Sequence, residues 1–185
     1  MRAAPLLLLF LASCAPLPPA AHPRPASNVV AVVFYHTAVH QQVVLDGLAD
    51  MYRGFDVDFD FAYDLGPKFT LIVTDEPPEA WKVTEPTAVG AAPLNCHGAA
   101  GGVALSFYCS RDEDTCYRSG AHEIGHVMIG LEHVVGDTDL MGTQYKPGAH
   151  FTDQELPTLL GICRGRQNSI SMLRAVLGSA PDRLP

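Results

Sequence analysis

The sequence predicts a single α+β domain in which helices pack against a sheet. Its 185 residues suit one domain, and 48% of them are hydrophobic against 17% charged, which is enough for one sizeable core. Apolar, β-branched runs mark the strands, and apolar residues recurring every three to four positions mark the helices. We therefore expect one folded domain over residues 28–180.

The first strand and the first helix are predicted before Gly54. Residues 29–35 form a continuous β-branched and apolar run, as in a strand that is covered on both faces. Residues 39–53 then carry apolar side chains at helical spacing, until Gly54 ends the pattern. A strand followed by a helix thus opens the domain.

Further strands follow in the middle of the chain. Residues 55–61 alternate apolar side chains with aspartates, which predicts a strand with one buried and one wet face. A solvated face is favoured over a calcium site, because alternate strand residues lack the backbone carbonyls of a calcium loop. Residues 68–74 and 102–108 are predicted strands, and residues 87–91 a short edge strand.

Two helical regions complete the prediction. An acidic loop leads into a helix over residues 115–130, since acidic residues suit a helix N-terminus. Thr152 is the predicted N-cap of a closing helix, with Glu155 as its capping-box partner. The apolar stripe of this helix would be Leu156, Leu159, Leu160 and Ile162. Apolar residues within 172–177 either extend it or form a second short helix.

The net charge and the length of the apolar runs exclude two classes of protein. With 20 acidic and 12 basic side chains the net charge is -8, which would repel the phosphates of a nucleic acid. No apolar run reaches the roughly 20 residues that a membrane-spanning helix needs. We expect neither a nucleic-acid-binding protein nor an integral membrane protein.

Residues 1–13 are predicted to be a signal peptide. A basic residue precedes the apolar run 5–11, and the Leu-Ala-Ser-Cys that ends at Cys14 resembles the bacterial lipobox, in which the cysteine is lipidated. Residues 14–27, rich in Pro and Ala, would then be an extended tether. This predicts a protein exported from a bacterial cell and anchored to a membrane surface of the envelope, the outer membrane or the cell surface. If ordinary cleavage discards Cys14, the protein is secreted.

Four cysteines remain for the folded domain, Cys96, Cys109, Cys116 and Cys163. An even number in an oxidising compartment favours two disulfides. Cys109 with Cys116 is the preferred pair, because six residues separate them across a predicted strand-to-helix turn, and this leaves Cys96 with Cys163. A zinc site of four cysteines is the alternative, but no C-x-x-C spacing supports it.

The informative segment is His-Glu-Ile-Gly-His, residues 122–126. On a helix His122 and His126 stand one turn apart on the same face, so both imidazoles can bind one metal ion, for which Zn²⁺ fits best. Glu123 lies beside them, where a carboxylate can take a proton from an attacking water. His133 is the predicted third ligand, because a left-handed turn at Gly130 could bring it back to the metal.

The same segment resembles the metzincin metalloproteases, whose pattern is HExxHxxGxxH followed by a Met-turn. The matrixin branch is the most similar: Gly-Leu-Glu-His ends at His133, Met141 follows eight residues later, and Tyr145 four after that. The run at residues 151–156 is also similar to the start of that branch's closing helix. The resemblance is strong over residues 119–162, and upstream only the order of elements agrees.

This resemblance implies both a fold and a site. The fold would be a twisted, mostly parallel five-stranded sheet with an antiparallel edge strand, an active-site helix and a C-terminal helix. The site would be that of a zinc endopeptidase whose protein or peptide substrate lies extended along the edge strand. Met141 would lie beneath the metal without binding it. Tyr145 would border a substrate pocket, although a tyrosine packed on the surface is equally consistent with the pattern.

One departure from the family pattern affects the third ligand. Three residues separate His126 from Gly130 where metzincins have two, and one more helical residue would turn His133 away by about 100°. A π-bulge within residues 127–129 could absorb it. Otherwise Asp137 or Asp139 would supply the third ligand.

The sequence therefore predicts a zinc endopeptidase with His122, His126 and His133 as ligands and Glu123 as general base and acid. One alternative is a surface protein that keeps the metzincin fold and binds metal or protein without catalysis, and another is a lipoprotein that delivers zinc. The remaining histidines have no ligand spacing and are interpreted as surface or core residues: His36, His40, His97 and His150. The oligomeric state stays open.

Overall fold

The computed structural model describes residues 28–66, 68–96, 101–143, 146 and 148–180. The predicted signal peptide, the lipidated Cys14 and the tether lie outside these residues, as do His97 and Tyr145. Within the described part, no helix has the length and apolar character needed to cross a membrane.

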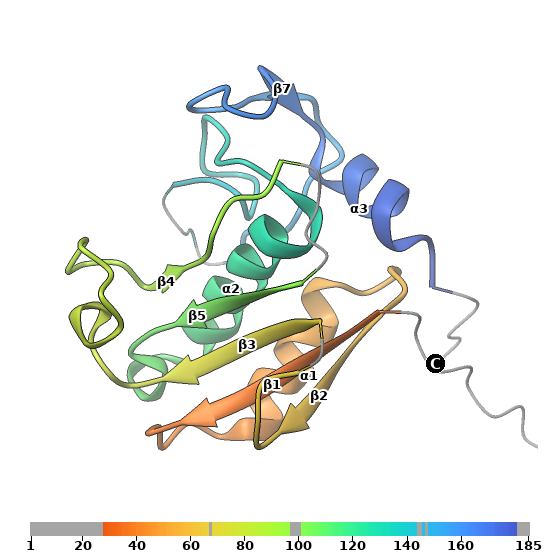
Figure 1. The fold of residues 1–185 in the computed structure, drawn as a ribbon. Helices are drawn as coiled ribbons and strands as arrows, with labels where there is room; N and C mark the ends of the chain where they lie inside the picture. The colour runs from red at the N-terminus through yellow and green to blue at the C-terminus, as the bar shows by residue number, and fades with distance from the viewer. Residues whose placement is uncertain (1–27, 67, 97–100, 144–145, 147, 181–185) are drawn as a thin grey trace, which may run out of the picture.

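A five-stranded sheet forms the centre of the fold, as predicted (Figure 1). Its strands, in spatial order, are β2 (Val57–Ala62), β1 (Asn28–Tyr35), β3 (Phe69–Thr74), β5 (Gly102–Ser106) and β4 (Gly90–Ala91). The first four run parallel, and β4 pairs antiparallel with β5 at the edge. The predicted α+β class, with a mostly parallel sheet and an antiparallel edge strand, is therefore confirmed.

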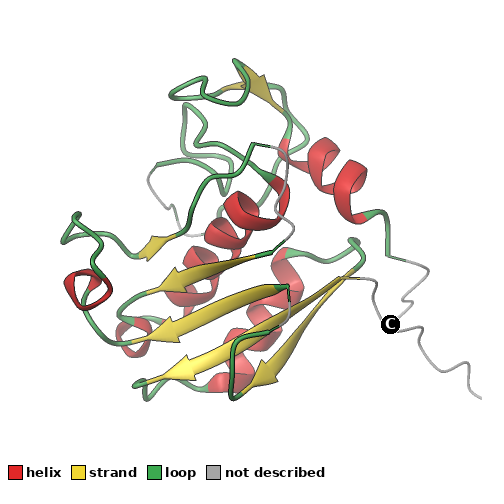
Figure 2. Ribbon diagram, viewed as in Figure 1, coloured by secondary structure: helices red, strands yellow, loops and turns green. Residues whose placement is uncertain are grey.

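Two helices, α1 (Gln41–Met51) and α2 (Glu113–Ile124), cover one face of this sheet, as Figures 1 and 2 show. Leu48 of α1, Leu71 of β3 and Ile124 of α2 have no exposed surface and belong to one hydrophobic core. The Tyr52 hydroxyl donates a hydrogen bond of 2.9 Å to the Ala121 carbonyl, which ties the end of α1 to α2. Helix α2 thus rests on a rigid base.

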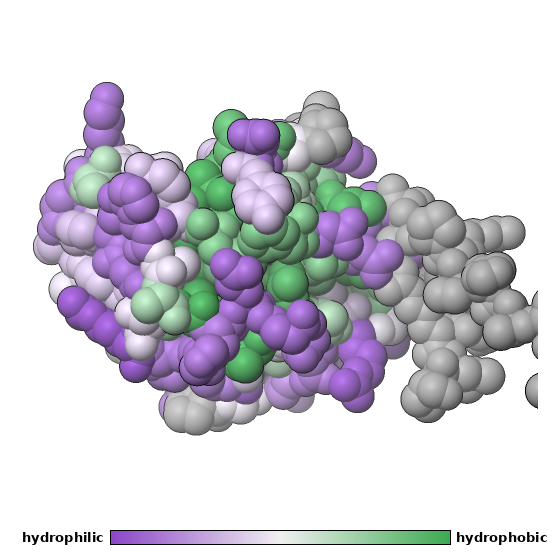
Figure 3. Space-filling view, turned by 90° about the horizontal axis from the view of Figure 1, so that it is seen from below, coloured by the Kyte–Doolittle hydropathy of each residue, from purple (hydrophilic) through white to green (hydrophobic). Residues whose placement is uncertain are grey.

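Apolar side chains reach the surface at the β2 edge of the sheet. Phe61 stacks on Phe34 with ring centroids 6.1 Å apart, and Tyr63, which is 87% exposed, meets the edge of Phe61. Seen from below, this side of the molecule has hydrophobic residues in its middle and hydrophilic ones around them (Figure 3). The opposite edge of the sheet, formed by β4, borders the candidate site.

Both preferred disulfides are present. Cys109 pairs with Cys116, and Cys96 pairs with Cys163, with S–S distances of 2.14 and 2.01 Å. A zinc site of four cysteines is thereby excluded. The first disulfide holds the short turn before α2, and the second joins the segment after β4 to the C-terminal part of the chain.

The predicted start of the closing helix is wrong. Residues 152–162 contain no helix; the C-terminal helix is α3 (Ser169–Leu177), and Asn168 is its N-cap. Thr152 cannot cap a helix, because its N–H and its hydroxyl both donate to Oδ2 of Asp139, at 2.9 and 2.7 Å. The chain instead forms a small antiparallel pair, β6 (Leu156–Pro157) with β7 (Arg166–Gln167). Three residues of the supposed apolar stripe are exposed: Leu159, Leu160 and Ile162.

The two helix starts predict different effects of substitution. The Asn168 side chain accepts a hydrogen bond of 2.8 Å from the Ser171 N–H, so Asn168→Ala should lower the free energy of unfolding by about 1 kcal/mol. Glu155→Ala should change it by less than about 0.5 kcal/mol, because the exposed Glu155 side chain caps no helix. Urea denaturation measures both values. A larger effect for Glu155→Ala than for Asn168→Ala would favour the helix start predicted at Thr152.

Candidate metal centre

Helix α2 carries the first half of the candidate site. Asp112 caps it by accepting the Asp114 N–H at 3.1 Å, and acidic residues occupy its first turn, as predicted. Arg118 is buried and donates to Asp114 (2.7 Å) and to the Ala149 carbonyl (2.5 Å), which fastens the helix to the loop beyond the site. His122 and His126 follow on this anchored helix.

The last turn of the helix is π-helical, over Gly125–Ile129. In a π-helical turn the backbone takes in one extra residue without changing the direction in which the chain leaves. The Leu131 N–H then bonds the Gly125 carbonyl at 3.1 Å, and the helix ends. The predicted bulge is thus confirmed, and it begins two residues earlier than expected.

Gly130 turns the chain back toward the histidines. Its φ of 74° is in the left-handed region, where a side chain is disfavoured. A Cβ at this position would also overlap the carbonyl oxygen of Asn95. Two independent constraints therefore require glycine here, and the turn they permit returns His133 to the helix.

The three histidines meet at their Nε2 atoms. The separations are 3.0 Å between His122 and His126, 3.0 Å between His122 and His133, and 3.2 Å between His126 and His133. Among the described residues these three form the one group of His, Cys, Asp or Glu side chains that could hold a metal ion.

Backbone carbonyls orient two of the rings. Nδ1 of His122 lies 2.7 Å from the Leu140 oxygen, and Nδ1 of His126 lies 2.6 Å from the Leu131 oxygen. A carbonyl can only accept, so each Nδ1 carries the proton and each Nε2 presents a lone pair. The rings are thus held in the tautomer that binds a metal through Nε2.

The donor set fits a divalent cation. Lone pairs that face one another at these distances repel unless a cation lies among them, and tetrahedral zinc with Zn–N bonds of about 2.0 to 2.1 Å places its nitrogens about 3.3 Å apart. Burial lowers the pKa of His122 well below its ordinary value, that of His126 to about 4, and that of His133 as well. The imidazoles are therefore neutral near pH 7, as metal ligands must be.

Glu123 lies beside the histidines in a cleft of about 440 Å³. Burial raises the pKa of its carboxyl group to about 8. A cation bound by the histidines would lower this pKa again, because a nearby opposite charge favours the carboxylate. Residues 87–92, which include β4, also line the cleft.

The edge strand is held close to Glu123. The Ser119 hydroxyl donates to the Val89 carbonyl at 2.7 Å, and the Phe107 N–H donates to the same oxygen at 2.9 Å. A Cβ on Gly90 would meet Oε1 of Glu123 at 2.7 Å, so only glycine permits this approach. Strand β4 therefore packs directly against the Glu123 side chain.

The aspartates considered as alternative ligands lie elsewhere. Asp139 is buried and accepts hydrogen bonds from the Met141 N–H (2.8 Å), from Thr152 and from the Ser169 hydroxyl (3.2 Å). Asp137 pairs with Lys146. Neither joins the histidine group, so the structure brings His133, and not an aspartate, to His122 and His126.

Met141 occupies the supporting position that the sequence predicted. It has no exposed surface, and a Cβ on Gly125 would meet its sulfur at 3.1 Å. It therefore packs beneath the π-helical turn and is not part of the ligand group.

The other described histidines lie outside the group. Nδ1 of His36 lies 2.8 Å from Glu76, and Nδ1 of His40 lies 2.6 Å from Glu113, both at the surface. His150 is exposed and pairs through its backbone with Leu140. Their interpretation as residues outside the site agrees with these positions.

The sequence analysis missed the role of Glu132. This buried carboxylate accepts the Ile162 N–H at 2.7 Å and the Arg164 N–H at 2.8 Å, and the Gln167 side chain bonds both its backbone N–H and its carbonyl at 2.8 Å. An acidic residue between an apolar Leu131 and a ligand was the available signal. The hydrogen-bond partners of its carboxylate are backbone groups, which leave no signal in the sequence.

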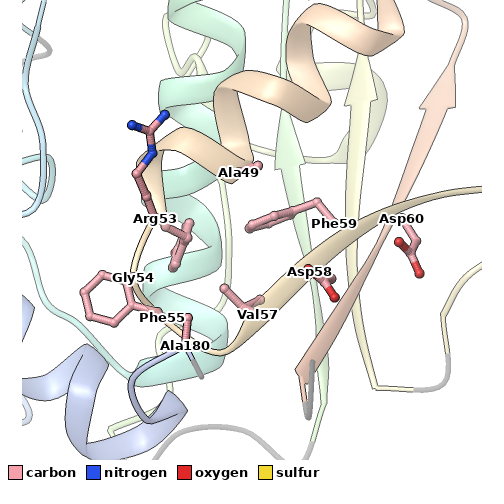
Figure 4. A pocket seen from close by; sticks show the side chains of 10 residues that line it. Ala49, Arg53, Gly54, Phe55, Val57, Asp58, Phe59, Asp60 and Ala180 are labelled. Carbon is pink, nitrogen blue, oxygen red and sulfur yellow. The ribbon is translucent and has the colours of Figure 1, made fainter. Parts of the chain in front are cut away.

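A separate hollow of about 370 Å³ lies between α1 and β2 (Figure 4). Arg53, Phe55, Asp58 and Ala180 are among its lining residues. It shares no residue with the histidine group, and we assign it no chemistry.

Comparison with known proteins supports the fold. No family model matches the chain, and no curated protein sequence matches it. Among solved structures, metalloproteinase-II from Bacteroides fragilis is similar, with a TM-score of 0.52 and 14% sequence identity over 86% of this chain. The match spans 55% of that protein's chain. At this identity the likeness shows a shared metalloproteinase fold.

The choice of ligands can be tested on the two aspartates. Asp139→Ala should lower the free energy of unfolding by about 2 to 4 kcal/mol, because it leaves several buried donors without an acceptor. Asp137→Ala removes only a surface ion pair and should cost about 0.5 kcal/mol or less. Urea denaturation gives both values. Zinc measured by mass spectrometry should stay equimolar in Asp137→Ala, and its loss would make Asp137 a ligand.

The turn at Gly130 predicts a specific loss of metal affinity. Gly130→Ala should weaken zinc binding about tenfold or more, because the clash with Asn95 displaces His133. Gly148→Ala is the control: Gly148 has a similar φ of 83°, but no atom lies within 4 Å of its Cβ position. Competition with a chromogenic chelator measures both affinities. Equal affinities would show that the close approach at Gly130 does not position the ligand.

Proposed function

We propose that this protein is a zinc endopeptidase of the metzincin type, with a matrixin-like arrangement of its ligands. The observation that carries the proposal is the convergence of three Nε2 atoms, at 3.0 to 3.2 Å, in a cleft that also contains a buried carboxylate. The metalloproteinase fold supports it independently.

Zn²⁺ is the proposed metal, held by His122, His126 and His133. Three neutral imidazoles with an open fourth position are the usual donor set of catalytic zinc. When bound, zinc would act as a Lewis acid toward water and toward the scissile carbonyl. The carbonyl oxygens of Leu140 and Leu131 keep the rings of His122 and His126 aligned.

The chain's own groups would bind and orient the substrate. Among the described strands β4 is the last one on its side of the sheet, so an extended peptide can add to it as a further strand. Ser119 fixes this strand against α2 through the Val89 carbonyl. A peptide on this strand would therefore lie close to Glu123, because the missing Cβ of Gly90 lets β4 pack against the Glu123 side chain.

Glu123 would move the proton. As a carboxylate it takes a proton from the attacking water, and as an acid it gives the proton to the leaving amine. Its burial beside the metal ligands keeps bulk water from competing for that proton. Protein or peptide is thus the proposed substrate class.

We also propose that the protein is exported and lipid-anchored. Two disulfides are typical of proteins outside the reducing cytoplasm, which supports export. Lipidation at Cys14, after removal of residues 1–13, would attach the domain to the cell envelope through the tether at residues 14–27.

The test is a comparison of zinc content and proteolysis. Wild type should bind one zinc and cleave an unstructured protein, and Glu123→Gln should keep the zinc but lose about 10²- to 10⁴-fold in rate. His133→Ala should lose both. Zinc removal by a chelator should abolish cleavage, and zinc addition should restore it.

Two outcomes would contradict the proposal. Tight zinc without cleavage of a broad substrate panel would favour the non-catalytic binding protein. Cleavage that persists in Glu123→Gln would remove the general base from the mechanism.

A further inference from the structure

An apolar cavity of about 230 Å³ opens beside the histidines, where the chain leaves β4. Ala92 and Leu94 line one side, and Leu160 and Ile162 line the other. His126 and His133 border both this apolar pocket and the cleft of Glu123. The apolar pocket is therefore continuous with the candidate metal centre.

Covalent and polar bonds hold the two walls of the apolar pocket together. The Cys96–Cys163 disulfide joins the segment that carries Leu94 to the segment that carries Ile162. Nη2 of Arg164 donates to the Cys96 carbonyl at 3.0 Å across the same gap. The walls thus form a shaped surface that exists before a ligand binds.

Glu132 fixes the second wall beside His133. Its two carboxylate oxygens accept the N–H groups of Ile162 and Arg164, at 2.7 and 2.8 Å. Both oxygens are engaged by backbone, so the acidic group anchors the wall and leaves hydrophobic surface for a ligand. The buried carboxylate of Glu132, next to His133, therefore serves to hold the loop that carries Ile162 and Arg164.

The wall residues are exposed although they are large and apolar. Leu160 is 70% exposed and Ile162 is 63% exposed, and both line the apolar pocket. Exposed apolar surface in a concave site rimmed by polar groups marks a binding site. An apolar cavity of roughly 150 Å³ can hold a benzene ring, so this one has room for one large side chain.

We propose that the apolar pocket binds one large aliphatic or aromatic side chain of the peptide substrate, on the N-terminal side of the scissile bond. This inference rests on the proposed function for the identity of its ligand as a peptide. Leu160 and Ile162 are its specificity-determining residues. A charged side chain is rejected there, because the walls offer no partner for the charge.

The direction of the bound peptide follows from the direction in which β4 runs. The chain runs from the cleft wall at Thr87–Gly90, through Ala91, to the apolar pocket at Ala92 and Leu94. Antiparallel pairing is the more stable arrangement for an added strand. A peptide antiparallel to β4 has its N-terminal residues at the apolar pocket and its C-terminal residues beside Thr87.

A binding experiment tests the apolar pocket without requiring turnover. Zinc-loaded Glu123→Gln is titrated with fluorescent peptides that are uniform in Ala and Gln except for one Leu, moved one position at a time. One register should bind about tenfold more tightly than the peptide without Leu, and Lys or Asp in that register should remove the gain. The same titration with Leu160→Ser/Ile162→Ser added should show no preferred register.

A cleavage experiment tests the direction. Unfolded proteins are digested by zinc-loaded wild type, and the new termini are identified by mass spectrometry. Leu, Ile, Met or Phe should be enriched at one position shortly before the cleaved bond. In Leu160→Ser/Ile162→Ser this enrichment should disappear.

Leu159→Ser is the matched control. Leu159 is 51% exposed on the same loop but does not line the apolar pocket, so its substitution should leave binding and cleavage preference unchanged. Zinc content is measured for every variant, to confirm that the metal centre remains intact.

The outcomes separate the two proposals. The proposal that the apolar pocket binds a substrate side chain is overturned if no register is preferred, or if the preference survives in Leu160→Ser/Ile162→Ser. Enrichment of large apolar residues only after the cleaved bond overturns the proposed direction of the peptide along β4. A Leu-dependent register without any cleavage by wild type upholds the apolar pocket as a peptide site and overturns the endopeptidase.

Discussion

The mutual approach of three imidazole nitrogens is the constraint on which the rest of the structure depends. His122 and His126 present their Nε2 lone pairs to each other at 3.0 Å, and Nε2 of His133 lies 3.0 to 3.2 Å from both, an arrangement that a cation would stabilise. The π-helical turn at Gly125–Ile129, the left-handed Gly130 and the carbonyls of Leu131 and Leu140 all serve to produce this convergence. Each is a local departure from regular structure that the buried surroundings maintain.

The surroundings are built to resist movement. Met141 fills the space under the turn. The carboxylate of Asp139 accepts hydrogen bonds from N–H and hydroxyl groups of three separate segments. Arg118 bonds the middle of α2 to the Ala149 carbonyl. Such support would hold the three histidines in place for a metal ion, as a site with an open coordination position requires.

The C-terminal part of the chain contributes more than a closing helix. The segment between Phe151 and Asn168 returns to the metal centre, where Glu132 and the Cys96–Cys163 disulfide hold it against the segment after β4. Its exposed Leu160 and Ile162 give the site a hydrophobic border. We infer that substrate preference in this protein is set by this late segment as well as by the edge strand.

The sequence by itself determined the elements whose signal is local. Periodicity gave the strands and the helices α1 and α2, the acidic first turn gave the start of α2, and the spacing of His122 and His126 gave two ligands on one helical face. The short separation of Cys109 and Cys116 gave the disulfides, and the extra residue before Gly130 gave the π-helical turn. All of these depend on neighbours within a few positions along the chain, except the Cys96–Cys163 disulfide, which was the pair left over once Cys109 was assigned to Cys116.

Tertiary structure decided what depends on distant partners. Thr152 and Glu155 have the local pattern of a capping box, but the buried carboxylate of Asp139 binds Thr152 instead, and the helix begins at Ser169. Glu132 stands beside a ligand in the sequence, yet its role comes from backbone N–H groups 30 and 32 residues later. A local pattern states only which bonds a residue can make. Which of them form is decided when folding brings competing partners into a buried space, where an unpaired polar group is too costly to remain.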